Sequence, residues 1–372
     1  MPKRSNFIVL LLLFIGIKLA LAESMNSNTN LYPGETLQTI NQTEVLTYFR
    51  PGDPEQPTII FIPGNSHLAR ISYGFPDGKE DDFIAYWLHK QGYPFLAISY
   101  PLENPIFKKT YPDYTLQNWA DSVIGATQKA IRENKLSNEI IVVGWSMAGE
   151  LTPVLETKAD EAGLELSLFI GLSPAVPLYN LQPVGDFFEK LTPLSNGLAN
   201  TMQFSDFFVE MKSQQEKQHG HTIIPDTVYT TQFIGNCPIN IMGTSKRYSH
   251  QEFINNLADT LHDGHAEDIT EYPHIAVIHG NPGSDLDYVQ YSNYDWGSII
   301  LRKYDSLCTS YEQNHNPLTN PLSELIKTID GNHMFFIGKE NATTTAKTID
   351  KLIKTNNDIL NKIHRICVKH SK

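Results

Sequence analysis

The segment from Glu139 to Gly149 constrains the fold most strongly, because an apolar run ends there in a serine flanked by small residues. Residues 140–143 read Ile-Ile-Val-Val, and Gly-Trp-Ser-Met-Ala-Gly follows them. β-Branched residues favour a strand, and small neighbours two positions before and after a serine relieve crowding where a strand turns sharply into a helix. Such a turn strains the serine backbone and exposes its hydroxyl. The pattern predicts a strand–turn–helix unit with Ser146 at the turn, with an ordinary strand-to-helix turn as the alternative.

Short apolar runs alternate with helical patterns around that unit. Strands are predicted at 58–62, 95–100, 139–144 and 166–172, helices at 81–91 and 118–136, and one or two edge strands within 36–48. A run that is apolar throughout fits a strand buried on both faces, as in a parallel sheet covered by helices. The predicted fold class is therefore α/β, with a mostly parallel central sheet and helices on both faces.

The second half of the chain has a looser pattern. Weak periodicity over residues 176–236 predicts an inserted cap or lid, and further helices on the sheet edge are the alternative. Strands are then expected at 238–243, 274–280 and 324–329, and a final helix carries an apolar stripe. The stretch 281–320, rich in Asn, Tyr, Ser and Asp, is expected to be largely loop.

The N-terminus predicts export. Residues 1–22 combine Lys3 and Arg4 with an apolar run and the small-residue site Ala20-Leu21-Ala22. These are the parts of a secretory signal peptide, which gives a secreted or periplasmic protein. The apolar run is shorter than the ~18 to 20 residues that span a bilayer, so an uncleaved anchor is the second interpretation.

The charge balance argues against a nucleic-acid partner. The chain carries 29 Lys and Arg against 41 Asp and Glu, a formal net charge of −12, which becomes −15 without the three cations of residues 1–22. Such a protein is repelled by phosphate backbones and anionic lipid surfaces. Its three cysteines, Cys237, Cys308 and Cys367, lie too far apart for a metal or redox motif and allow at most one disulfide. We expect no metal and no organic cofactor.

In element order and in three motifs the chain resembles the α/β-hydrolases, serine lipases and esterases above all. The motifs are the turn at Ser146, the segment Gly331-Asn-His-Met-Phe335 after the last predicted strand, and Phe61-Ile-Pro-Gly-Asn-Ser66 after the first buried strand. The resemblance implies Ser146 as nucleophile and His333 as its base, in the family's chain order of serine, acid and histidine. His279 is a second candidate base, and His333 as an ordinary loop histidine is the alternative.

The same resemblance implies an oxyanion hole made by the backbone N–H groups of Met147 and Asn65. An ordinary Pro-Gly turn is the alternative for the second of these. The acid has no carboxylate at its usual place after residues 238–243. We therefore expect it after the strand at 274–280, as Asp285 with Asp287 second, although either aspartate also fits a turn or a solvated surface.

The predicted function is hydrolysis of carboxylic esters, of the lipase or esterase type, through an acyl-enzyme. The predicted core comprises residues 23–175 and 237–372, with the cap at 176–236 and Phe204, Phe207 and Phe208 as possible lining of an acyl pocket. The expected substrate is a small acyl ester or a lipid. An acyltransferase, thioesterase or peptidase would use the same groups, and a non-catalytic binding protein on the same scaffold is a further alternative. Acyl-chain length and oligomeric state stay open.

Overall fold

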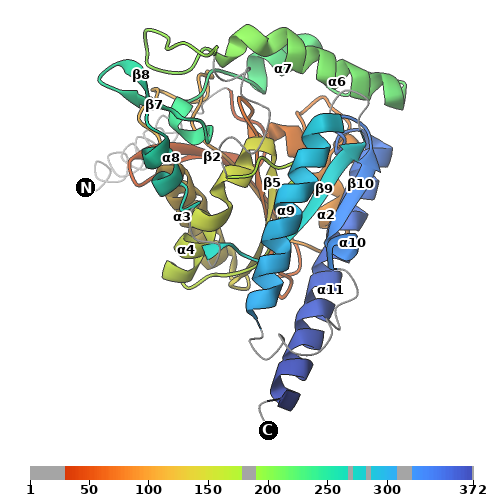
Figure 1. Ribbon diagram of the computed structural model, residues 1–372. Helices are drawn as coiled ribbons and strands as arrows, with labels where there is room; N and C mark the ends of the chain where they lie inside the picture. The colour runs from red at the N-terminus through yellow and green to blue at the C-terminus, as the bar shows by residue number, and fades with distance from the viewer. Residues whose placement is uncertain (1–29, 178–189, 267–270, 282–285, 308–320, 371–372) are drawn as a thin grey trace, which may run out of the picture.

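A computed structural model describes residues 30–177, 190–266, 271–281, 286–307 and 321–370. The predicted signal peptide lies outside them, and so does part of the predicted cap. Helices surround a central sheet, and a long C-terminal helix extends beyond it (Figure 1).

Eight strands form the central sheet in the described part of the chain. Their order is β1 (Glu35–Ile40), β2 (Thr43–Arg50), β4 (Phe95–Ser99), β3 (Thr58–Ile62), β5 (Glu139–Trp145), β6 (Glu165–Leu172), β9 (Ile275–Asn281) and β10 (Ile326–Asp330). β2 is antiparallel to both of its neighbours, and every other neighbouring pair is parallel. The mostly parallel sheet predicted from the sequence is confirmed.

Helices cover both faces of this sheet. Every residue of β3 and β4 is buried, and successive side chains of a strand point to opposite faces, so both faces must be covered. The covering helices that contact strands are α2 (Ile84–Lys90), α3 (Leu116–Asn134), α4 (Thr152–Glu161), α9 (Leu286–Ser306) and α11 (Lys339–His370). The short α10 (Pro321–Leu325) leads into β10.

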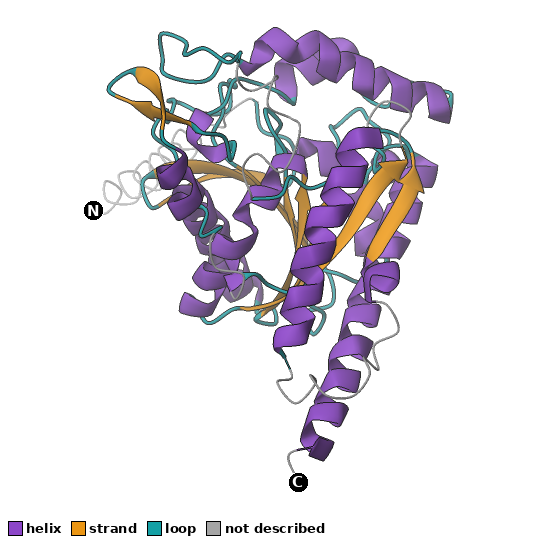
Figure 2. Cartoon of the chain, viewed as in Figure 1, coloured by secondary structure: helices purple, strands orange, loops and turns teal. Residues whose placement is uncertain are grey.

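A segment between β6 and β9 lies over the carboxyl ends of the strands. It contains η4 (Thr201–Phe204), α6 (Ser205–His219) and α7 (Asp226–Gln232). Figure 2 shows the arrows of β9 and β10 pointing toward α6. The boundaries 176–236 of a separate cap stay a prediction, because residues 178–189 lie outside the described residues.

Two sequence predictions of secondary structure are wrong. Residues 238–243 form no strand of the sheet but the short turn η5 (Ile239–Ile241), followed by a separate hairpin of β7 (Lys246–Ser249) and β8 (Glu252–Asn255). Residues 281–320 are not largely loop, because α9 occupies much of that stretch. The last strand also begins later than predicted, at Ile326, since α10 precedes it.

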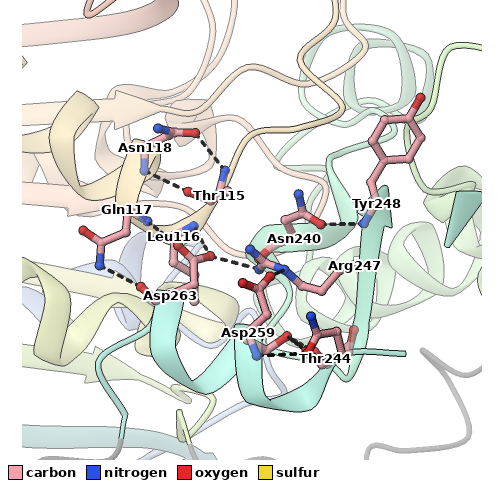
Figure 3. A network of polar contacts seen from close by, with 12 residues as sticks. Thr115, Leu116, Gln117, Asn118, Asn240, Thr244, Arg247, Tyr248, Asp259 and Asp263 are labelled. Atoms are coloured by element: carbon pink, nitrogen blue, oxygen red, sulfur yellow. Dashed lines mark hydrogen bonds and ion pairs between the residues drawn. The ribbon is translucent and has the colours of Figure 1, made fainter. Parts of the chain in front are cut away.

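A polar network attaches the hairpin and α8 (Leu257–Asp263) to the core (Figure 3). The Asp263 carboxylate accepts the backbone N–H groups of Leu116 and Gln117, at 2.9 and 3.2 Å, at the first turn of α3. Arg247 of β7 pairs with the same carboxylate at 2.9 Å and with Asp259 at 2.7 Å. An acidic group at a helix N-terminus accepts hydrogen bonds from unpaired N–H groups and interacts favourably with the positive end of the helix dipole. Asp263 thus caps α3 from a distant part of the chain.

The helices of the described residues include none with the length and apolar character that crossing a bilayer requires. No cluster of three or more His, Cys, Asp or Glu residues suited to a metal ion occurs in the same ranges.

Candidate active site

Ser146 stands at a sharp turn between β5 and the helical segment η3 (Ser146–Leu151), which continues into α4. Its φ is +52°, in the left-handed region that residues with a Cβ rarely adopt. A strained serine between a strand and a helix is the geometry of a nucleophile elbow. The side chain is half-buried at the carboxyl edge of the sheet.

Small residues make this turn possible. A Cβ on Gly144 would lie 2.5 Å from the Phe169 ring, and one on Gly149 would lie 2.0 Å from the Ala175 carbonyl oxygen. Both distances are too short for any side chain. The Ala148 methyl group would in addition lie 3.3 Å from a Cβ on Gly144, which further restricts position 144. The sequence pattern predicted small residues at 144 and 148. The structure shows a steric limit at 144 and a further one at 149.

The turn is also fixed through its own backbone. The Ala175 N–H donates to the Ser146 carbonyl at 2.8 Å, which joins the turn to the chain after β6. Met147, buried, follows in the first turn of η3, where backbone N–H groups have no helical partner. An N–H group in this position can bind a developing negative charge.

The β3 loop (residues 63–68) runs against the serine. A Cβ on Gly64 would lie 2.9 Å from the Ser146 Cβ, so only glycine allows this approach. The next residue, Asn65, is half-buried, and its side-chain oxygen accepts from Ser66 Oγ at 3.0 Å and from Cys237 Sγ at 3.1 Å. With that oxygen engaged inside the protein, the backbone N–H is the group of Asn65 best suited to a ligand beside Ser146.

The β10 loop (residues 331–334) brings His333 to the same region. The Trp145 indole N–H donates to the His333 carbonyl at 3.0 Å, and the two rings lie 5.7 Å apart. Since Trp145 immediately precedes Ser146, this contact joins the β10 loop to the serine turn. The His333 side chain is half-buried and takes part in further interactions.

Asn332 anchors the β10 loop to α6. Its side-chain amide donates to the Met211 carbonyl at 2.6 Å, while its side-chain oxygen accepts the Met334 N–H at 2.9 Å. The Asn332 N–H also points to the Gln215 side-chain oxygen at 3.4 Å. The orientation of the β10 loop therefore depends on a helix outside the sheet.

The predicted acids lie at the border of the described residues. Asp285 falls in 282–285, outside them, and Asp287 is in the first turn of α9 with its side chain not described. β9 ends beside the β10 loop, because Asn281 bridges to Gly331 and a Cβ on Gly280 would lie 2.5 Å from the Asn332 carbonyl. β9 thus ends next to the His333 loop, and both aspartates stay predictions.

His279, the second candidate base, is fully buried on β9. Neither ring nitrogen meets the geometry of a hydrogen bond within the described structure, although the Asn293 side chain of α9 lies near enough to oppose part of the pKa shift. Burial, with a smaller contribution from nearby His333, lowers the pKa of His279 to about 4. An imidazole with that pKa accepts protons weakly at neutral pH, so His279 is a poorer base than an imidazole near its ordinary value.

Two buried residues near the serine turn were not singled out from the sequence. The His67 ring contacts the rings of Trp145 at 4.8 Å and Phe208 at 5.2 Å, and burial lowers its pKa to about 4. The Glu150 carboxyl lies against Gly243, and burial raises its pKa well above the usual range. In the sequence, only the position of His67 directly after the Pro-Gly-Asn-Ser motif could have pointed to it as a residue of the site.

Comparison with known proteins adds little beyond the fold. No protein-family model matches the chain, and no curated protein sequence is significantly similar to it. Among solved structures, Est1E from Butyrivibrio proteoclasticus is 12% identical, with 86% of this chain and 99% of that chain covered and a TM-score of 0.42. A structure from a study of carboxylesterases of the thaumarchaeon Nitrososphaera gargenis is 11% identical, with 88% and 100% covered and a TM-score of 0.47.

A third structure, that of AqDC, which cleaves the ring of the Pseudomonas quinolone signal, is 10% identical, with 85% and 99% covered and a TM-score of 0.48. Likeness at this level does not extend to activity. The assignment of an α/β-hydrolase fold rests on this chain's own features: the mostly parallel eight-stranded sheet, the helices on both faces and the serine turn after β5.

Proposed function

We propose that this protein is a serine hydrolase that cleaves carboxylic esters through an acyl-enzyme. The observation that carries the proposal is the left-handed backbone of Ser146 at the carboxyl end of β5. Gly64 lies directly against this serine, and the Trp145 contact links it to the His333 loop. A half-buried serine hydroxyl next to the His333 loop and to the backbone N–H groups of Met147 and Asn65 suits acyl transfer.

In the proposed mechanism Ser146 Oγ attacks the ester carbonyl carbon while the His333 imidazole takes its proton. The backbone N–H groups of Met147 and Asn65 stabilise the oxyanion of the tetrahedral intermediate, each by about 3 kcal/mol. Collapse of this intermediate expels the alcohol, which receives the proton from His333. Water then attacks the carbonyl carbon of the acyl-enzyme while His333 takes a proton from it. Collapse of this second tetrahedral intermediate releases the carboxylic acid, and His333 returns the proton to Ser146 Oγ. Asp285, with Asp287 as second choice, fixes the tautomer of His333 and stabilises its charged form.

The substrate class is proposed as an acyl ester or lipid whose apolar chain lies under α6. Phe208 of that helix is buried and faces His67 in the β3 loop, which supports an apolar wall beside the serine. Phe207 is 54% exposed and packs on Phe208 with ring centroids 6.0 Å apart, so it lies farther out. Export by the predicted signal peptide is part of the proposal.

Hydrolysis of p-nitrophenyl esters tests this function. We expect the native chain to release p-nitrophenol and to be labelled by a fluorophosphonate, and Ser146→Ala to lose both, with kcat lower by at least about 10³-fold. A series of acyl-chain lengths distinguishes a lipase from an esterase. A folded native chain with neither turnover nor labelling would refute the proposal and leave a binding protein on this scaffold.

A further inference from the structure

We propose that Tyr100 and His67 are positioning residues that fix the direction of the Asn65 N–H before substrate binds. Neither side chain is assigned a contact with substrate. The inference deepens the proposed function, because it concerns the second donor of the proposed oxyanion hole. It rests on hydrogen bonds that hold two successive carbonyl groups of the β3 loop.

The first of these carbonyls belongs to Gly64. Tyr100 directly follows β4, its side chain is fully buried, and its hydroxyl donates to the Gly64 carbonyl at 2.8 Å. The described chain has no cis peptide bond, so the Asn65 N–H points away from the Gly64 carbonyl across a planar peptide. By holding that carbonyl toward the core, Tyr100 turns the Asn65 N–H outward, and we infer that it faces Ser146.

The second carbonyl belongs to Asn65. His67 Nδ1 lies 2.6 Å from the Asn65 carbonyl, which accepts only, so Nδ1 carries the proton. Nε2 then accepts from the Tyr229 hydroxyl of α7 at 2.6 Å. The neutral imidazole that burial favours provides this pairing of one donor and one acceptor. Both peptide planes that flank Asn65 are thereby fixed.

The backbone between these groups explains why two anchors are present. Ser66 has a φ of +62°, and the His67 N–H approaches the Gly64 carbonyl at 3.4 Å, so the loop reverses direction as a tight turn. The Ser66 carbonyl is itself bonded to the Gly235 N–H at 3.0 Å. Hydrogen bonds to these successive carbonyls hold each peptide of the turn in one orientation. A donor already aimed at the oxyanion needs no reorganisation in the transition state.

Tyr100→Phe, compared with Tyr114→Phe, tests this role. Tyr114 is the matched control, because it too is buried and its hydroxyl donates to Ser122 Oγ at 2.9 Å. We expect Tyr100→Phe to lower kcat for a p-nitrophenyl ester about 10- to 100-fold with KM unchanged, because a misdirected donor loses part of the effect of a deleted one. Tyr114→Phe should leave both constants near those of the native chain.

A boronic acid inhibitor separates positioning from a merely structural role. Its tetrahedral adduct with Ser146 places an oxygen in the oxyanion hole, so its Ki should rise in proportion to the fall in kcat for Tyr100→Phe. His67→Gln keeps a donor and an acceptor. Its fall in kcat and its rise in Ki should therefore both be smaller than those of Tyr100→Phe.

Equal kinetics of Tyr100→Phe and Tyr114→Phe in an active protein would overturn the positioning role alone, as would a rise in KM at constant kcat. A native chain without Ser146-dependent turnover would overturn the proposed function as well.

Discussion

The two loops that meet at Ser146 are held in different ways. The β3 loop is buried at every position except Asn65, which is half-buried, and three successive carbonyls, of Gly64, Asn65 and Ser66, accept hydrogen bonds. The carbonyls of the β10 loop, at Asn332, His333 and Met334, accept hydrogen bonds too, but residues 331–333 are only half-buried. The two loops therefore differ in burial, and the β10 loop is in addition joined to α6 through the Asn332 side chain.

The difference matches the two tasks of the proposed mechanism. An oxyanion donor works best when it does not move, since its contribution comes from preorganisation. A histidine that receives a proton from one oxygen and delivers it to another needs freedom to adjust its ring. Asn65 accordingly stands on the more deeply buried loop, and His333 stands on a half-buried loop whose position α6 can influence.

The largest effect is expected from changing the β3 loop at its closest approach to the serine. In Gly64→Ala the new methyl group would lie 2.9 Å from the Ser146 Cβ, so the loop must move away and carry the Asn65 N–H with it. We expect kcat for a p-nitrophenyl ester to fall at least about 100-fold, because one oxyanion donor contributes about that much. Steady-state kinetics with thermal unfolding checks the result.

Gly297→Ala is the control for that variant. A Cβ on Gly297 of α9 would meet Leu322 at an ordinary 3.6 Å, so kinetics should not change and stability should rise slightly. If Gly64→Ala kept the kcat of this control, the β3 loop would be able to move away from Ser146 without loss of the Asn65 donor, and it would not be the rigid loop proposed.

A smaller effect is expected at the β10 loop. Asn332→Ala removes the hydrogen bonds to Met211 and Met334, so the loop loses its side-chain attachment to α6 and, among the described contacts, keeps only that of its N–H with Gln215 at 3.4 Å. We expect a fall in kcat of about tenfold, because His333 is displaced but not removed. Gln214→Ala, on the same helix but bonded only to Glu210 in the described contacts, is the control. A loss in Asn332→Ala as large as in Gly64→Ala would erase the proposed contrast between the loops.

The smallest effect on catalysis is expected at His279, where pH is the useful variable. Its pKa is about 4 in the folded chain and about 6.5 unfolded, so the unfolded chain binds the proton first as pH falls. The contribution of His279 to folding stability is therefore constant above about pH 6.5 and declines between pH 6.5 and 4, by up to about 3 kcal/mol.

His279→Met removes this titration and should retain most of the kcat. The Tm of the variant minus that of the native chain should grow as pH falls from 6.5 to 4, measured by differential scanning fluorimetry. A constant difference would show that His279 is not buried in its neutral form. Loss of activity comparable to His333→Ala would make His279 the base.

The sequence was most informative where steric constraints are local. The β-branched run before Ser146 and the small residues around it predicted the strand and the turn, because crowding at such a turn is decided within a few residues. The position of the β10 loop followed from element order. By contrast, the hydrogen bonds of Tyr100 to the Gly64 carbonyl and of Asn332 to the Met211 carbonyl join residues far apart in the chain, and no local pattern predicts such contacts.

The wrong predictions have physical reasons too. In residues 238–243 alternation of apolar residues looked like a strand, although Pro238 begins a tight turn whose side chains are buried by packing. In residues 281–320 polar composition hid a helical stripe. Trp296, Ile299, Ile300 and Tyr304 recur at helical spacing and are all buried on α9. Periodicity would have been a better guide there than composition.

The left-handed backbone of Ser146 has an evolutionary consequence. A Cβ at positive φ is disfavoured by roughly 1–2 kcal/mol, whereas glycine adopts the same angle freely. Glycine at the same position would therefore bring a small gain in stability. If the proposed reaction were no longer under selection, a lineage would be free to drift to glycine at 146 while retaining every strand of the sheet, and a fold intact without its serine would record that loss.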